Sequence, residues 1–280
     1  MTTIDATLRH ALEVSGPDLI LTLDPALQGL PETAHGGAVL AVFDSLSGAT
    51  APREVSGIYR RRVPLGLPLT LRRAREDSAE TFVLSDQAGS VLVDGRVAPL
   101  PARVAAGAPG RSDNGGGHPL PVSRTCFACG TDNDLGLRAR LAFDAGTVRA
   151  TWQPRAPFRR PDGTLAPAAL TTLLDEAAFW LGALATGESG MTTELRVSLH
   201  RPAPFDAPVT VTGARSSVRP RDDDARYQET EIVACAGDHV VATAHITFVV
   251  VRGAARRLVS GMLAINDPEC VRRVFPGYTR

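Results

Sequence analysis

The amino-acid sequence carries the same order of predicted elements twice, and this repeat limits the possible folds more than any other feature. In each half, two short strand-like segments precede an apolar segment of helical length, and four further strand-like segments follow it. The apolar segments are residues 36–46 (GGAVLAVFDSL) and residues 167–184 (PAALTTLLDEAAFWLGAL). A Pro-x-x-x-Pro turn also recurs, at 64–68 and 204–208. The repeat predicts a tandem duplication.

Both apolar segments lack a polar face, which predicts helices that are enclosed on most sides. The strand-like segments contain β-branched and aromatic residues between turn signals. The predicted strands are residues 7–14, 18–24, 55–61, 67–75, 80–86 and 90–97 in the first half, and 135–143, 147–153, 191–201, 207–217, 226–235 and 240–251 in the second. An enclosed helix against a mostly antiparallel sheet predicts the α+β fold class.

A stretch rich in glycine and proline separates the two halves, as is typical of an interdomain linker. We therefore expect a first unit at residues 1–100, a linker at 101–125, a second unit at 126–252 and a tail at 253–280. Within the tail, the sequence Asp-Pro-Glu at 267–269 predicts the start of a short helix.

The composition excludes several classes of partner and reaction. The 30 basic and 30 acidic residues balance, so no global field favours nucleic acid or an anionic membrane. All of the basic residues are arginine, which excludes lysine nucleophiles and Schiff bases. No apolar run reaches 18 residues, and the N-terminus lacks the pattern of a signal peptide. We expect a cytoplasmic protein with reduced thiols.

Two short motifs resemble a known family. A His-Gly-Gly tripeptide at 35–37 opens the first apolar segment, and Asp44 lies eight residues after its first glycine. The segment GTLAPAALTTLLDEA at 163–177 is similar, and Cys-Phe-Ala-Cys-Gly at 126–130 precedes the second half. Together with the repeat, these residues resemble the hotdog-fold acyl-CoA thioesterases of the 4-hydroxybenzoyl-CoA and phenylacetate-pathway types.

The resemblance covers roughly residues 7–98 and 126–251. It implies a double hotdog, in which two units, each a sheet wrapped around a central helix, form a pseudo-dimer within one chain. It also implies that each active site lies between the two units, with the glycine from one unit and the acid from the other. Hotdog units commonly assemble further, so a homo-oligomer of such chains is expected.

The resemblance assigns roles to the motif residues. The N–H of Gly36, with or without Gly37, would hold the oxyanion at a helix N-terminus. Asp175 or Glu176 would activate water as a general base or attack the thioester directly. His35 would shape the loop or bind the acyl group.

The two expected sites are unequal. Pro167 lies eight residues before Asp175, where the first half has Gly36 eight residues before Asp44. Proline has no N–H, so the second half lacks the oxyanion donor. The site that pairs Gly36 with Asp175 or Glu176 is therefore expected to work. The site that pairs Pro167 with Asp44 is not, and Asp44 would remain as a buried carboxylate.

Clustered arginines are candidates for binding the phosphates of coenzyme A or phosphopantetheine. The candidates are Arg60, Arg61, Arg62, Arg159 and Arg160. The alternative for each of them is a solvated strand face on which arginines pair with acids.

Cys126 and Cys129 form half of a zinc site, for which His118 is the nearest third ligand in sequence. No second Cys-x-x-Cys is present, so we interpret the pair as structural thiols in a tight turn. We expect no metal and no cofactor.

The sequence thus favours an acyl thioesterase that acts on acyl-CoA or an acyl-carrier-protein thioester at one asymmetric site. One alternative is a catalytically degenerate protein that binds an acyl or hydrophobic ligand. Another is a dehydratase, isomerase or cyclase on the same scaffold, because one fold hosts several chemistries.

Overall fold

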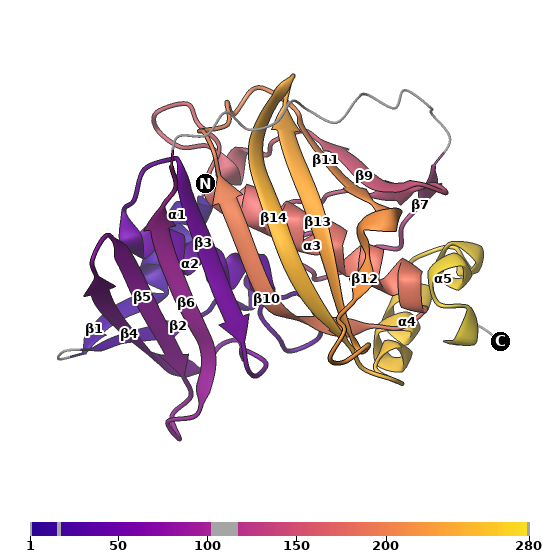
Figure 1. Ribbon diagram of the computed structural model, residues 1–280, viewed down its shortest axis with the longest axis horizontal. Helices are drawn as coiled ribbons and strands as arrows, with labels where there is room; N and C mark the ends of the chain where they lie inside the picture. Colours follow the sequence, from indigo (N-terminus) through magenta and orange to yellow (C-terminus); the bar gives the residue numbers. More distant parts are fainter. Residues whose placement is uncertain (1, 16–17, 102–116, 279–280) are drawn as a thin grey trace.

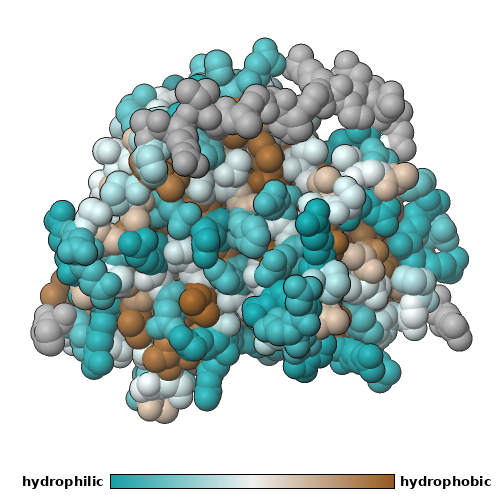
Figure 2. All heavy atoms as spheres, in the orientation of Figure 1, coloured by the Kyte–Doolittle hydropathy of each residue, from teal (hydrophilic) through white to brown (hydrophobic). Residues whose placement is uncertain are grey.

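A single curved antiparallel sheet dominates the computed structural model, which describes residues 2–15, 18–101 and 117–278. In these residues, fourteen strands join in one sheet, and two helices lie side by side against its inner face (Figure 1). The face on the strand side, seen in Figure 2, is covered mainly by hydrophilic residues with smaller apolar patches. The core therefore lies between the sheet and the two helices.

The first half forms one arm of the sheet, in the order β1-β2-β4-β5-β6-β3. Its central helix is α2 (Gly36–Ser47), which packs against β6 and β3, and a short helix α1 (Ile4–His10) precedes β1. The strands are β1 (Leu12–Ser15), β2 (Asp18–Thr22), β3 (Arg53–Tyr59), β4 (Pro68–Glu76), β5 (Ala79–Ser85) and β6 (Val91–Pro99).

The second half forms the other arm, in the order β10-β14-β13-β11-β9-β8-β7, around the longer helix α3 (Pro167–Thr186). Its strands are β7 (His118–Pro119), β8 (Ala142–Phe143), β9 (Thr147–Trp152), β10 (Gly190–Leu199), β11 (Val209–Ala214), β12 (Arg219–Pro220), β13 (Tyr227–Ala236) and β14 (His239–Val250). Helices α4 (Ala255–Leu263) and α5 (Pro268–Val274) follow. Short 3₁₀ turns lie at Pro25–Leu27, Ala156–Phe158, Arg215–Ser217 and Pro276–Tyr278.

The two arms join where β3 pairs antiparallel with β10, with Gly57 opposite Leu195. This pairing removes one exposed edge from each arm, and it brings α2 against α3. The helices approach closely at Gly37, whose carbonyl oxygen accepts a hydrogen bond from Thr171 Oγ1 at 2.7 Å. A Cβ on Gly37 would lie 2.4 Å from the backbone oxygen of Thr171, so only glycine allows this approach.

Helix α3 is long and apolar enough to cross a membrane by length and composition. In the fold, however, 83% of its most apolar window is buried among other residues of the chain. It is the core helix of the second half, as its lack of a polar face predicted.

The structure confirms the expected α+β class and corrects two strands. Residues 7–14 were predicted as a strand, but α1 occupies Ile4–His10. Thr3 caps this helix by accepting a hydrogen bond from the Ala6 N–H, and Ile4 and Leu8 are buried at helical spacing. The Thr3 cap and the burial of Ile4 and Leu8 four residues apart therefore favour a helix over a strand in this segment.

The predicted strand at residues 135–143 is also wrong, since only Ala142–Phe143 are in a strand. Arg138 has a positive φ of 54°, which a continuous strand does not allow. The Asn133 side chain also accepts a hydrogen bond from the Gly136 N–H and holds a turn before it.

Two further predictions concern a helix in the C-terminal tail and the boundaries between the two units. The predicted tail helix is present as α5, with the Asp267 side chain accepting from the Glu269 N–H. The domain boundaries at residues 100, 126 and 252 stay predictions. Most of the expected linker, residues 102–116, lies outside the described residues.

Candidate functional site

The candidate site lies where the N-terminus of α2 meets the middle of α3. Gly36 is the first residue of α2, with His35 as the N-cap, and Asp175 comes from α3. A Cβ on Gly36 would lie 2.7 Å from Asp175 Oδ2, so the carboxylate can reach the helix end only beside a glycine. The structure thus brings together residues from the two halves that are about 140 positions apart in the sequence.

Three donors hold the Asp175 carboxylate. The Gly37 N–H donates to Oδ2 at 2.9 Å, His35 Nδ1 lies 3.1 Å from the same oxygen, and the Thr192 hydroxyl donates to Oδ1 at 2.7 Å. The Gly37 N–H also lies 3.2 Å from His35 Nδ1. A ring nitrogen that donates to Asp175 cannot accept, so we assign this N–H to the nearer carboxylate. Asp175 therefore fills the anion position at the start of α2.

The charges of this pair follow from their surroundings. Burial raises the pKa of Asp175, but the hydrogen bonds and charge of His35, with those of Thr192 and Gly37, outweigh burial and lower it below 3.8. Burial lowers the pKa of His35, yet its contacts with Asp175 and Glu176 raise it well above 6.5. The two shifts are opposite, and both favour the charged forms, a carboxylate beside a protonated imidazole.

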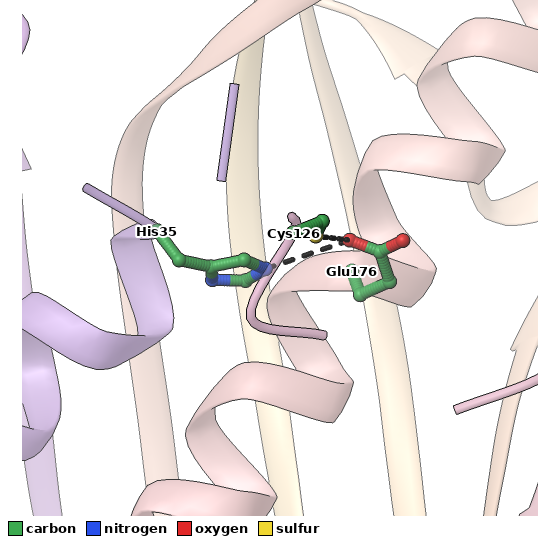
Figure 3. Close-up of side chains that lie close together, drawn as sticks. All are labelled: His35, Cys126 and Glu176. Carbon is green, nitrogen blue, oxygen red and sulfur yellow. Dashed lines mark hydrogen bonds and ion pairs between the residues drawn. The ribbon is translucent and has the colours of Figure 1, made fainter. Parts of the chain in front are cut away.

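Glu176 lies next to Asp175 on α3 and on the other side of the same imidazole. Its Oε2 is 3.5 Å from His35 Nε2 and 4.0 Å from Cys126 Sγ, and its Oε1 accepts from Trp180 Nε1 at 2.9 Å. Figure 3 shows His35 at the start of α2, Glu176 on α3 and Cys126 on a separate loop, with their polar atoms pointing toward one another. All three side chains are buried.

These residues line a pocket of about 590 Å³. Apolar side chains form part of its wall, including Phe179, Trp180, Leu258 and Met262. A concave, largely apolar pocket with a few converging polar groups is typical of a small-molecule site.

The predicted arginine cluster divides between two places. Arg60, Arg61 and Arg62 line this pocket, although Arg60 also forms an ion pair with Asp94. Arg160 instead pairs with Asp5 at 2.9 Å. The Arg159 guanidinium lies over the ring of Phe205, 5.3 Å from its centroid. Only the first group is placed to meet a ligand of this pocket.

Sequence reasoning missed two residues that fix the site. Tyr59 donates from its hydroxyl to the Gly36 carbonyl oxygen at 2.7 Å, and Thr192 holds Asp175. A bulge in β10 between Thr192 and Glu194 interrupts the strand alternation beside the site. No motif marks either residue, because both contacts depend on strands that pair far along the chain.

Asp44 has a different environment from Asp175. Its two carboxylate oxygens accept from Arg53 Nε and Nη2 at 2.5 and 2.7 Å, and both side chains are buried. Arg53 and Thr192 both lie on the strand that follows the acid's own helix. Asp44 thus pairs with an arginine of its own half, whereas Thr192 gives Asp175 only a neutral hydrogen bond and His35 of the other half lies against its carboxylate.

The Cys-x-x-Cys turn lies at the same pocket. Cys126 and Cys129 both line it, and the Phe127 N–H donates to the Gln28 carbonyl oxygen of the first half. His118, the third zinc ligand suggested by sequence proximity, contacts Arg273 and Phe143 instead. His118 is wrong as a partner for these cysteines because β7 carries it to the far edge of the sheet.

We predict that Arg53→Gln strongly destabilises the fold. The substitution leaves Asp44 as a buried carboxylate without its cation, which costs about 3–5 kcal/mol. Arg196→Gln is the control, because Arg196 pairs with Glu194 at the half-exposed surface, where an ion pair contributes about 0–1 kcal/mol. Urea unfolding of the two variants measures the difference, and equal midpoints would contradict the structural role of Arg53.

No family model and no curated protein sequence matches the chain. Solved structures are similar to it in fold. A proposed thioesterase II from Thermobifida fusca is 18% identical, with a TM-score of 0.63 over 90% of this chain and all of that one. A hot dog fold protein from Alicyclobacillus acidocaldarius is 12% identical, with a TM-score of 0.61 over 90% of this chain and 98% of that one.

An acyl-CoA thioesterase II from Mycobacterium marinum is 12% identical, with a TM-score of 0.59 over 90% of this chain and all of that one. Dehydratases also share the architecture, with TM-scores of 0.54 and 0.55. At these identities the likeness shows the fold and not the reaction. The chain therefore has a hotdog fold that extends over both of its halves.

Proposed function

We propose that the protein hydrolyses an acyl thioester, carried on coenzyme A or on an acyl-carrier protein, at one site between its two halves. The observation that carries this proposal is the carboxylate of Asp175, held against the N-terminus of α2 inside the pocket. The thioesterases among the structures of similar fold support the same reaction class. The four cysteines are free thiols, which fits a reducing compartment such as the cytoplasm.

The chemistry divides between the backbone of α2 and the carboxylate of α3. The Gly36 N–H is one of the unpaired donors of the first helical turn, and it makes no hydrogen bond among the described residues. It would polarise the thioester carbonyl and hold the oxyanion that forms when water attacks. Asp175 would take the proton of that water, and the thiolate of the carrier would leave as the carbonyl reforms.

Glu176 is the second acid at the site, and its contacts suit a supporting role. One oxygen accepts from Trp180, and the other faces His35 and Cys126. The side chain therefore orients the imidazole, which in turn contacts Asp175. We assign the proton transfer to Asp175 and the positioning of His35 to Glu176.

The acyl group and its carrier would occupy different parts of the pocket. The apolar side chains of Phe179, Leu258 and Met262 suit an acyl group. Arg61 and Arg62 suit the phosphates of coenzyme A or phosphopantetheine, because guanidinium groups bind phosphate through charge-assisted hydrogen bonds.

Dehydration of a 3-hydroxyacyl thioester is the second candidate, because dehydratases share this architecture and a His–Asp pair lines the pocket. That reaction needs a base to remove a proton next to the carbonyl. His35 faces Asp175 through Nδ1 and Glu176 through Nε2, so both ring nitrogens are engaged by acids of the chain, which favours hydrolysis. Assays with 3-hydroxyacyl-CoA separate the two reactions by their products, a free thiol or an enoyl thioester.

We predict that Asp175→Asn lowers kcat for acyl-CoA hydrolysis by a factor of about 10²–10⁴, since it removes the general base. Asp44→Asn is the matched change in the other half, and it should leave the rate per folded molecule within a few-fold of wild type. A thiol-release assay across short, long and aromatic acyl-CoAs measures both variants, with circular dichroism to confirm folding.

The reverse ranking of Asp175→Asn and Asp44→Asn would overturn the assignment of the site. Saturable acyl-CoA binding by the wild-type protein without release of a free thiol would instead support a protein that only binds its ligand.

We predict that the double substitution Arg61→Ala, Arg62→Ala raises KM for acyl-CoA about tenfold or more, because hydrogen bonds to charged groups contribute about 1.5–3 kcal/mol. KM for the matching N-acetylcysteamine thioester, which has no phosphate, should not change. Arg159→Ala serves as the control, because Arg159 lies against Phe205. An equal rise in KM for both substrates would exclude phosphate recognition by this pair.

A further inference from the structure

The Cys-x-x-Cys turn and the α2–α3 junction meet at one buried cluster. His35 Nε2, Cys126 Sγ and a carboxylate oxygen of Glu176 all lie within 4.8 Å of one another. Cys129 lies three residues further along the same turn and lines the same pocket. Imidazole, thiolate and carboxylate are the three ligand types that zinc takes in proteins.

The two distances from Glu176 are close to those between ligands around one ion. A tetrahedral ion with Zn–N and Zn–O bonds of about 2.1 Å and a Zn–S bond of about 2.3 Å separates N from O by about 3.4 Å and S from O by about 3.6 Å. The corresponding distances here are 3.5 Å for His35 to Glu176 and 4.0 Å for Cys126 to Glu176. Small side-chain rotations would close the difference, and Figure 3 shows the three groups already facing one point.

Each of the three side chains is also held in its orientation by a contact on the side away from the cluster. Asp175 holds His35 through Nδ1, which leaves Nε2 free to face the cluster. Trp180 binds Oε1 of Glu176 and leaves Oε2 free, and the Ala128 N–H donates to the sulfur of Cys126 at 3.3 Å. A carboxylate behind the histidine and hydrogen bonds to the other ligands are what metal sites use to orient their ligands.

We propose that this cluster is a zinc site, with His35, Cys126 and Glu176 as the ligands. Zinc takes the place of the proton on His35 Nε2 and of the Cys126 thiol proton, which are released on binding. Asp175 is not a ligand and keeps its place at the start of α2. The ion connects the loop that carries Cys126 to α3 and to the start of α2. The site therefore cross-links the two halves of the chain.

The zinc proposal does not rest on the proposed hydrolysis, because its test uses no substrate. The full-length chain, purified without a histidine tag, should contain about one zinc per molecule by elemental analysis. Cys126→Ser and Glu176→Gln should each lower the content to less than a tenth of that value. Cys235→Ser should retain it, because Cys235 lies on β13 and does not line the pocket.

A second measurement covers variants that fold poorly. The wild-type chain, stripped of metal and titrated with Co²⁺ alone, should develop a thiolate-to-cobalt charge-transfer band that saturates at one ion per chain. The band should be absent in Cys126→Ser and should persist in Cys235→Ser. Two results would overturn the proposal: zinc retained at one per chain in Cys126→Ser, or a wild-type chain that neither contains zinc nor shows the cobalt band.

Discussion

The hydrogen bond from the Gly37 N–H to the carboxylate of Asp175 is the contact on which the rest of the site depends. It joins the start of one central helix to the middle of the other, and it exists only because β3 and β10 continue one sheet into the next. Two glycines make room for it. Gly36 admits the carboxylate, and Gly37 admits the backbone of α3. A side chain at Gly37 would collide with the backbone of α3, and one at Gly36 would displace the Asp175 carboxylate.

The two halves compensate a buried acid on the central helix in different ways. Each central helix carries a buried acid, and a buried carboxylate is costly unless charges or hydrogen bonds compensate it. Asp44 is compensated by the guanidinium of Arg53 on its own half. Asp175 is compensated by a backbone N–H, a hydroxyl and a histidine, two of which come from the other half. The first arrangement pairs the acid with a cation away from the pocket, and the second places the carboxylate at the pocket wall.

The sequence predicted the α+β class, both central helices and most of the strands, because periodicity and turn residues are local signals. The contact between Gly36 and Asp175 follows the pairing that the family resemblance implied, and the inequality of the two sites at Pro167 stays a prediction. Prediction from the sequence failed at α1, where a cap and two buried residues outweigh β-propensity. It also failed at residues 135–143, where a positive φ at Arg138 breaks the strand.

The partners of the cysteines were beyond the reach of the sequence for a different reason. His35 and Glu176 lie 91 and 50 positions away from Cys126, on elements that only the joined sheet brings together. Proximity in sequence pointed to His118 instead, which the far edge strand carries away. Thr192 and Tyr59 were missed for the same reason, since their roles arise from strand pairing and a bulge.

The central claim is that one half supplies the oxyanion donor and the other the carboxylate. The most direct test compares kcat/KM for acyl-CoA hydrolysis in Gly36→Pro and Gly36→Ala. Both variants add the same Cβ toward Asp175 and therefore displace its carboxylate alike. Proline is tolerated at the first position of a helix, so the rates of the two variants differ mainly through the N–H. Loss of one oxyanion donor costs a factor of about 10²–10³, so the proline variant should be slower than the alanine variant by that factor. Equal rates in the two variants would contradict the account.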